Sequence, residues 1–554
     1  MEDPRTSQAL LPVDEFQTSF SGGMRDRDHP SQLQPNQYAY GKNIEVRDSG
    51  LASTRHSRFV ATGDCGSNGG TNPQGAYWYE PFPGQGMMVQ IQGGAAYRWR
   101  GSSHFWEPMG NLQLNNTSDR VAMCCQSNFL YVYGSSNGSD STWVYDPYAE
   151  TWTSLADLNT SAPWGNLVAI QLGRMCVAGV DFTVTPNIQD TRQYIFYSDT
   201  FVSAFNRVNN NTRISTDGGE PVKAISPYRN GQIIAWTRNN TKIIDISSAN
   251  VASFVQQTLD SHLGCVAPMT VVPVGEDVFF LSPDGHVRTI KRTQQDTAYG
   301  VSTPVSFWVP NLMGRINKHA MGKCAAAFFN NYYLLAAPMD TSGKNNGLIV
   351  FDLLQSIQVP SSIGQTVVPI CVGEWTNINA FQFVVTNFNN IQELYYIDST
   401  NGAAVKMFDS GQNDGSVNLT GDGQPIVHFV DSTIKTRAPN WNTPRHDKTM
   451  HDLEMQFLNT FGTVTVSYAR DDGNFNALFS GAIGDTSKAI LGSASTILPF
   501  YLASDPGLVN LPLSFFRQGR SRNWQLQIDF TGGTMNLKEI TMSAFIEGAS
   551  TRQV

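Results

Sequence analysis

Charged side chains are scarce in this chain. They make up 15% of its 554 residues, whereas an average soluble domain carries about 25%. Asn, Ser, Thr, Gln and 48 glycines take their place. Because solvated helices are normally built from Glu, Lys and Ala, this composition excludes a protein made mainly of surface helices and favours strands joined by turns.

Basic residues are fewer than acidic residues in this chain. The chain has 37 Lys and Arg residues against 46 Asp and Glu residues, which leaves a net charge of −9. A protein that grips nucleic acid through its phosphates needs a basic surface, so the charge argues against that class. The negative charge does not argue against a protein that DNA passes through without being bound.

Long apolar runs and a secretion signal are also lacking. Even residues 325–338 (AAAFFNNYYLLAAP) are interrupted by two Asn residues, and the chain opens on the polar, acidic stretch MEDPRTSQALLPVDE. We therefore expect no membrane-spanning segment and no signal peptide. The seven cysteines form no CxxC pair, which predicts reduced thiols in a protein made in a reducing cytoplasm. These cysteines are Cys65, Cys124, Cys125, Cys176, Cys265, Cys324 and Cys371.

A motif of nucleotide chemistry is missing as well. There is no GxxxxGK[ST] around Gly343-Lys344, so no phosphate-binding loop is expected. His446 and His451 are five residues apart, whereas a helical zinc pair needs a spacing of about four.

Acidic residues in a turn-rich stretch offer a further candidate ion site. Residues 409–425 contain Asp409, Asp414 and Asp422, but they lack the ligand spacing and terminal Glu of a calcium loop. We predict no catalytic residues, no cofactor, no bound metal and no enzymatic activity.

Repeated hairpins are what the chain does contain. Runs of β-branched and aromatic residues alternate with Asn-, Asp- and Gly-rich turns, and the repeats recur about every 50 residues, which is room for about four strands. Clear examples are residues 129–147, 228–246, 277–290 and 332–353. In WVYDPYAETW, a strand ends in Asp-Pro and Trp152 re-enters the core, as in a kelch blade. The pattern predicts an all-β chain with a β-propeller of about six blades.

The pattern changes at both ends of the propeller. Residues 1–40 are polar and form a predicted N-terminal arm, and the propeller body spans 41–430, with a boundary placed between 425 and 440. Residues 431–554 have longer alternating strands and form a C-terminal β-rich unit, either sandwich-like or a closing layer. Helical periodicity is sparse, and residues 250–262 and 315–327 are its best candidates.

The arm has too few apolar residues for a core of its own. We expect residues 1–40 to pack mainly against another chain, so that deleting them impairs assembly and leaves the propeller folded. The candidate interface residues are Leu10, Leu11, Phe16, Phe20 and Met24.

Residues 19–59 combine a Gly-containing arm with a hairpin in KNIEVRDSGLASTRHSRF, where Gly50 is free to adopt a positive φ. They resemble the start of the tail nozzle proteins, also called tail stabilisation or tail hub proteins, of short-tailed double-stranded DNA bacteriophages. The matching features are Gly23, Leu33, Pro35-Asn36, Asn43, Gly50-Leu51 and Arg55. Residues 194–199, 330–353 with Trp375, and 434–457 also fit this family.

The resemblance implies a structural virion protein in the tail, assembled in the cytoplasm of the host bacterium. It implies a homo-oligomeric ring, usually of six copies, below the head-to-tail adaptor protein, with tail fibre, spike or needle proteins attached and genomic DNA passing through its channel. An acidic or neutral channel lining would keep DNA centred and mobile. The arm has fewer basic residues than the family pattern, and the C-terminal unit has no assignment.

Two alternatives remain open. One is an adsorption protein that binds a host glycan through exposed aromatic residues. The other is a propeller-type enzyme that degrades polysaccharide, whose paired carboxylates would come together only in the fold.

Overall fold

Strands dominate the computed structural model. It describes residues 12–47, 50–63, 65, 72–101, 103–134, 142–155, 163, 165–179, 191–201, 204–206, 208–214, 219–297, 303–361, 364–409, 413–419, 425–483, 508–514 and 519–546. Within these residues the helices are too short and too polar for a segment that crosses a bilayer. The expected all-β fold is confirmed.

Seven blades, one more than the spacing suggested, form a β-propeller between residues 73 and 409. Blade 1 consists of β6 (Pro73–Tyr79), β7 (Met87–Gln92), β8 (Ala95–Trp99) and β9 (Glu107–Pro108). Blade 2 consists of β10 (Ala122–Gln126), β11 (Phe129–Tyr133), β12 (Trp143–Asp146) and β13 (Thr151–Ser154). Blade 3 consists of β14 (Leu167–Gln171), β15 (Arg174–Ala178), β16 (Tyr194–Tyr197) and β17 (Asn211–Arg213). Blade 4 consists of β18 (Ala224–Tyr228), β19 (Gln232–Trp236), β20 (Thr241–Asp245) and β21 (Val255–Asp260).

The remaining blades are less regular, which explains why the spacing undercounts them. Blade 5 has three short strands, β22 (Val272–Val274), β23 (Asp277–Leu281) and β24 (Val287–Thr289). Blade 6 is β25 (Ala325–Phe329), β26 (Tyr332–Ala337), β27 (Gly347–Ser361) and β28 (Gly364–Thr376). Blade 7 is β29 (Ala380–Phe388), β30 (Ile391–Asp398) and β31 (Ala404–Asp409), completed by β5 (Ser57–Val60) from the N-terminal region and extended by β32 (Asn413–Leu419) and β33 (Pro425–Phe429).

Apolar clusters between neighbouring blades close the ring. Separate clusters join blades 1 and 2, 2 and 3, 3 and 4, and 4 and 5, while the largest cluster includes blades 5, 6 and 7. A further cluster joins blade 7 back to blade 1. The first strand of blade 7, β29, also contacts β6 of blade 1. The core is therefore distributed around the ring, as expected for short strands that bury one face on each neighbouring sheet.

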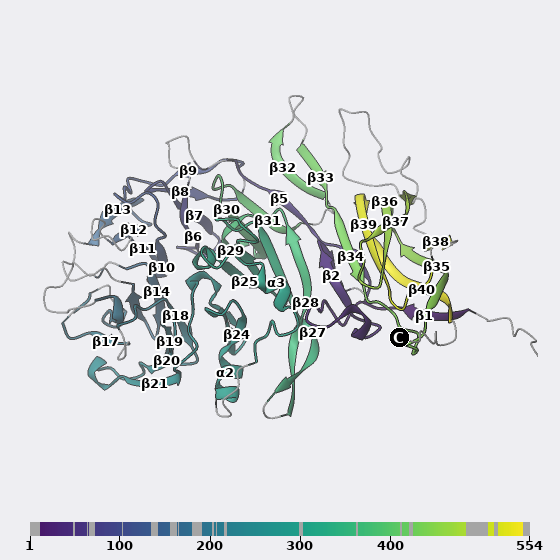
Figure 1. The fold of residues 1–554 in the computed structure, drawn as a ribbon. Helices are drawn as coiled ribbons and strands as arrows, with labels where there is room; N and C mark the ends of the chain where they lie inside the picture. Colours follow the sequence, from purple (N-terminus) through teal and green to yellow (C-terminus); the bar gives the residue numbers. More distant parts are fainter. Residues whose placement is uncertain are drawn as a thin grey trace, which may run out of the picture.

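Two sheets form the C-terminal unit at the other end of the molecule (Figure 1). Their strands are β34 (Ser432–Thr436), β35 (Lys448–Leu458), β36 (Phe461–Arg470), β37 (Asn476–Ile483), β38 (Leu508–Ser514), β39 (Trp524–Thr534) and β40 (Asn536–Ile546). Alternate side chains of β35, β36, β39 and β40 are buried in one cluster. This period-two burial is that of a sandwich with one solvated face on each sheet.

N-terminal strands connect the two parts. These are β1 (Val13–Gln17), β2 (Tyr38–Lys42), β3 (Ile44–Glu45) and β4 (Ala52–Thr54). Strand β2 lies between β28 and β34, so that one nine-stranded sheet runs from blade 6 into the C-terminal unit. Strands β1 and β4 both pair with β40. Strands β1 and β2, which contain the described strand residues of the arm, thus belong to the sheets of their own chain.

Both helix predictions from periodicity are wrong. Residues 250–262 contain the short 3₁₀ turn η3 (Val251–Ser253) and strand β21, and residues 315–327 contain η5 (Met321–Lys323) and the start of β25. Pairing of β21 with β20 overrides the weak helical pattern. The remaining helical segments described are η1 (Pro30–Gln32), η2 (Thr191–Gln193), η4 (Pro268–Thr270), α2 (Ile290–Thr297) and α3 (Pro310–Gly314).

Candidate functional site

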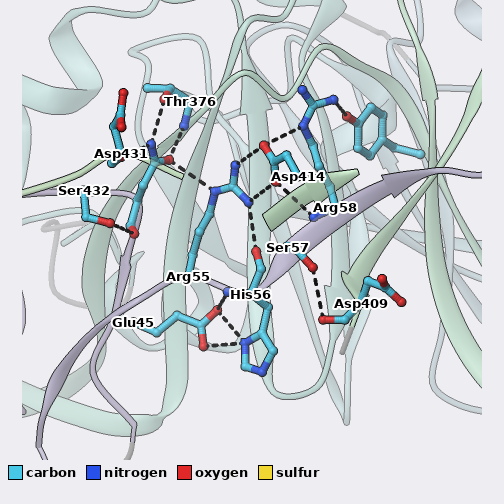
Figure 2. Close-up of polar contacts among 12 residues, drawn as sticks. Glu45, Arg55, His56, Ser57, Arg58, Thr376, Asp409, Asp414, Asp431 and Ser432 are labelled. Atoms are coloured by element: carbon cyan, nitrogen blue, oxygen red, sulfur yellow. Dashed lines mark hydrogen bonds and ion pairs between the residues drawn. The ribbon is translucent and has the colours of Figure 1, made fainter. Parts of the chain in front are cut away.

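A buried polar junction lies where the N-terminal hairpin passes from the C-terminal unit to the propeller (Figure 2). Strand β4 pairs with β40, whereas β5, only two residues further on, pairs with β31 and β32 of blade 7. Gly50, in the turn before β4, has a φ of +76° and approaches Ser19 so closely that a Cβ would lie 2.3 Å from the Ser19 Oγ. The expected positive φ is confirmed, and Asp48 and Ser49 lie outside the described residues.

Arg55 and Asp414 form the centre of this junction. The Arg55 guanidinium is 1% exposed and donates two hydrogen bonds to the Asp414 carboxylate, at 3.1 and 2.9 Å. Arg58 adds one hydrogen bond from its backbone N–H and one from Nε, both at 3.1 Å. Burial favours the neutral carboxyl, but the charges and hydrogen bonds of the two arginines outweigh it and hold the pKa of Asp414 below its ordinary value.

Asn43 ties the junction to the nine-stranded sheet. It has a φ of 54°, a left-handed conformation that Asn tolerates better than most residues. Its side-chain oxygen accepts from Arg55 Nε at 3.3 Å and from the Thr376 backbone N–H at 2.8 Å. Its amide donates to Thr376 Oγ1 and to the Asp431 carbonyl. One side chain therefore connects β28, the start of β34 and Arg55.

Glu45 holds the segment between β4 and β5. Its carboxylate accepts a hydrogen bond from the His56 backbone N–H at 2.9 Å and contacts His56 Nδ1 at 2.8 Å. Arg55 also donates to the His56 carbonyl at 2.8 Å. Each acidic group of the junction therefore has a fixed partner, and the arrangement acts chemically as a hydrogen-bonded tie between sheets.

A cavity of about 430 Å³ borders the junction and contains two carboxylates, Asp340 and Glu374. Arg315 contacts Asp340 at 2.9 Å and Glu374 at 2.7 Å, and Tyr40 donates to Glu374. The hydrogen bond from Arg315 lowers the pKa of Asp340 below its ordinary value. A general acid needs a raised pKa, so Asp340 is not suited to that role.

The five interface candidates have different environments. Leu10 and Leu11 lie outside the described residues. Phe16 is on β1 and is 50% exposed, so it remains available to a partner. For Phe20 and Met24 the prediction is wrong, because both are buried in the core of their own chain. The Phe20 ring contacts the Tyr38 ring edge-on with a centroid distance of 6.2 Å.

The third stretch of the family resemblance, residues 434–457, contains a fully buried lysine. Lys448 donates three hydrogen bonds to backbone carbonyls, those of Thr443 at 2.9 Å, His446 at 3.1 Å and Arg522 at 2.9 Å. Burial lowers the pKa of Lys448 and Asp447 partly offsets this effect. The three carbonyls compensate the buried ammonium group and fix the loop that precedes β35.

The candidate ion ligands lie in different environments. His446 lies in the loop before β35, whereas His451 lies within the strand. Asp409 is 3.7 Å from Lys406, Asp414 is bound by arginine, and Asp422 lies outside the described residues. The described residues contain no group of three or more His, Cys, Asp or Glu side chains that could hold a metal ion.

All seven cysteines are free, and all except Cys125 are buried. Burial raises the pKa of each thiol, for example that of Cys176 and Cys265 to about 12. At neutral pH these groups are protonated and behave as small apolar side chains.

No protein-family model and no curated protein matches the chain. Solved structures similar to it include PorZ, an essential surface component of the type-IX secretion system of Porphyromonas gingivalis, with 13% identity, a TM-score of 0.34, and coverage of 64% of this chain and 38% of PorZ. Hydrazine synthase of Kuenenia stuttgartiensis has 12% identity, a TM-score of 0.37 and coverage of 62% and 97%. An exo-β-1,3-galactanase of Phanerochaete chrysosporium has 12% identity, a TM-score of 0.25 and coverage of 88% and 100%. At such values the function must be argued from the residues of this chain.

Proposed function

We propose that this protein is a structural subunit of a bacteriophage tail nozzle, a ring below the head-to-tail adaptor through which the genome leaves the virion. The observation that carries the proposal is the place of the family-like residues. Asn43 and Arg55 lie at the centre of the buried junction, and Gly23 packs against Cys371 of β28 so closely that a Cβ would lie 2.9 Å from its carbonyl oxygen. The resemblance therefore concerns residues that join the two parts of the fold.

The joined architecture suits a ring subunit. A continuous sheet and a satisfied polar junction hold the propeller and the C-terminal sandwich in one relative position, and a ring of defined diameter needs such a rigid repeating unit. The net charge of −9 per chain suits a channel lining that repels phosphates weakly. The lining residues, the adaptor and the tail fibre, spike or needle partners belong to the proposal.

Exposed apolar side chains on one long hairpin offer a surface for a neighbouring copy. The hairpin of β27 and β28 extends beyond the body of the propeller (Figure 1). It carries Leu354 and Val367, which are 64% and 60% exposed. Burial of such side chains between copies would contribute roughly 1.5–3 kcal/mol each if it were complete.

The test is the oligomeric state of the purified chain, measured by mass photometry and by electron microscopy. We expect a closed ring, with a hole wide enough for a DNA duplex and without an excess of Lys and Arg along it. The Leu354→Lys/Val367→Lys variant should shift the chain to monomers, because charges desolvated at a contact oppose association. Val208→Lys exchanges a similarly exposed side chain in blade 3 and should leave the ring intact. A monomer at every concentration, with or without the adaptor, would refute the nozzle proposal.

A further inference from the structure

A second cavity lies between blades 1 and 7, and none of its lining residues belongs to the polar junction. Its volume is about 640 Å³, which is within the range of sites for small ligands. It is bounded by the loop from β6 to β7, the residue that follows β8, and the turn from β29 to β30. The lining residues are Trp78, Glu80, Gly84, Gln85, Gly86, Met87, Arg100, Asn387, Phe388, Asn389 and Asn390.

Aromatic rings form one wall of this cavity and are held in place by their neighbours. Trp78 and Phe388 contact each other edge to face, with centroids 4.7 Å apart and an angle of 81° between the rings. Phe388 in turn packs on Trp99 at 5.2 Å. Gly86 lies against the Trp78 ring, where a Cβ would come within 2.0 Å of it. The wall is therefore preorganised, and glycine is required at position 86 to let the Trp78 ring lie there.

Polar groups surround this aromatic wall. Asn389 and Asn390 form the two-residue turn of a hairpin, with φ values of 52° and 63°. This turn geometry fixes the backbone positions from which their side-chain amides extend. Glu80 accepts a hydrogen bond from the Gly84 backbone N–H at 2.9 Å and keeps further acceptor capacity. Arg100 is exposed at the edge of the cavity and supplies donors.

We propose that this cavity binds one or two sugar rings of an oligosaccharide. The apolar face of a pyranose packs on an aromatic ring, while its hydroxyl groups need donors and acceptors around the rim, and the cavity provides both. Amides, one carboxylate and one guanidinium supply hydrogen bonds, so the proposed activity is binding. The proposal stands independently of the nozzle proposal, since it rests on residues of blades 1 and 7 only.

Saturation-transfer difference NMR and calorimetry with the full chain test this site. The probes are maltohexaose, chitohexaose, mannohexaose and hexagalacturonate. We expect at least one to bind the unaltered chain and to change its tryptophan fluorescence, and this change should be smaller in Trp78→Phe if the saccharide contacts Trp78. Trp78→Ala should weaken that binding about tenfold or more, which corresponds to about 1.4 kcal/mol, and Trp78→Phe should restore part of it. Gly86→Ala should also weaken it, because the added methyl group displaces the Trp78 ring.

The control is Phe201→Ala, which removes an exposed aromatic side chain of blade 3 and should leave binding unchanged. Circular dichroism and the unfolding midpoint identify variants that fail to fold. If all four saccharides fail to bind, or if Trp78→Ala and Arg100→Ala bind as the unaltered chain does, the site is refuted. Mass photometry of the same variants reports ring formation, so failure of this site is distinguishable from failure of the nozzle proposal.

Discussion

Replacing Asp414 with asparagine is expected to lower the free energy of unfolding by about 3–5 kcal/mol, the usual cost of removing one partner of a buried ion pair. The substitution keeps the size of the side chain and removes its charge. It leaves Arg55, which is almost fully buried, without its counter-ion, and it weakens the hydrogen bonds from Arg58. Denaturant unfolding, followed by tryptophan fluorescence, measures the loss.

The effect should depend on pH in a defined direction. The pKa of Asp414 is lower in the folded chain than its ordinary value, so its ionisation contributes stability that is fully present above the ordinary value of about 3.9. That contribution is lost as the pH falls through the lower, folded-state pKa. The stability difference between the unaltered chain and Asp414→Asn should therefore be largest near neutral pH and shrink in acid.

Asp409→Asn is the matched control, because Asp409 is partly exposed and is 3.7 Å from Lys406. Its loss should cost about 1 kcal/mol or less. If Asp414→Asn is as stable as the control, or if the difference between them stays constant from pH 7 to acid, the junction does not contribute as we infer.

Phe20→Ala is expected to destabilise the isolated chain by about 3–5 kcal/mol, as for a buried phenylalanine elsewhere. Phe20 is fully buried in the core of its own chain. Phe16→Ala in the same arm is the control, since Phe16 is half exposed and its loss should change stability by about 0.5 kcal/mol at most. The unfolding midpoints of the two variants, measured on monomers, show whether Phe20 stabilises its own chain. Equal midpoints would mean that the arm docks on another chain.

Deletion of residues 1–40 should then unfold more than the arm. It removes part of β2, which separates β28 from β34, and thereby breaks the nine-stranded sheet between the propeller and the C-terminal unit. Limited proteolysis should release fragments from both parts. The propeller is therefore not expected to stay folded without the arm.

Local sequence patterns were sufficient to predict the repeated hairpins. The stretch WVYDPYAETW became β12 and β13, with Trp152 buried and its Nε1 donating to the Met109 carbonyl at 2.7 Å. Such predictions succeed because period-two burial and turn residues act over a few positions along the chain.

Local sequence patterns could not predict contacts between segments that are far apart in the chain. Arg55 and Asp414 are 359 positions apart, and Asp414 drew attention only as an ion ligand in a turn-rich stretch. Arg55 was singled out only as part of the family resemblance, which named no partner for it. Nor did the arm's few apolar residues reveal that Phe20 would fill a space beside Tyr38.

The sequence by itself determined that the chain is all-β, with propeller hairpins, longer alternating strands after residue 430 and a deficit of positive charge, because composition and alternation act locally. Only the tertiary structure decided that β5 completes blade 7 and that β2 joins the two parts in one sheet. It also decided that Phe20 and Met24 of the arm lie in the core, and that Trp78 of blade 1 contacts Phe388 of blade 7. The physical reason is that the gain from burying apolar surface and pairing charges depends on which segments meet in space, and the order of residues along the chain does not state this.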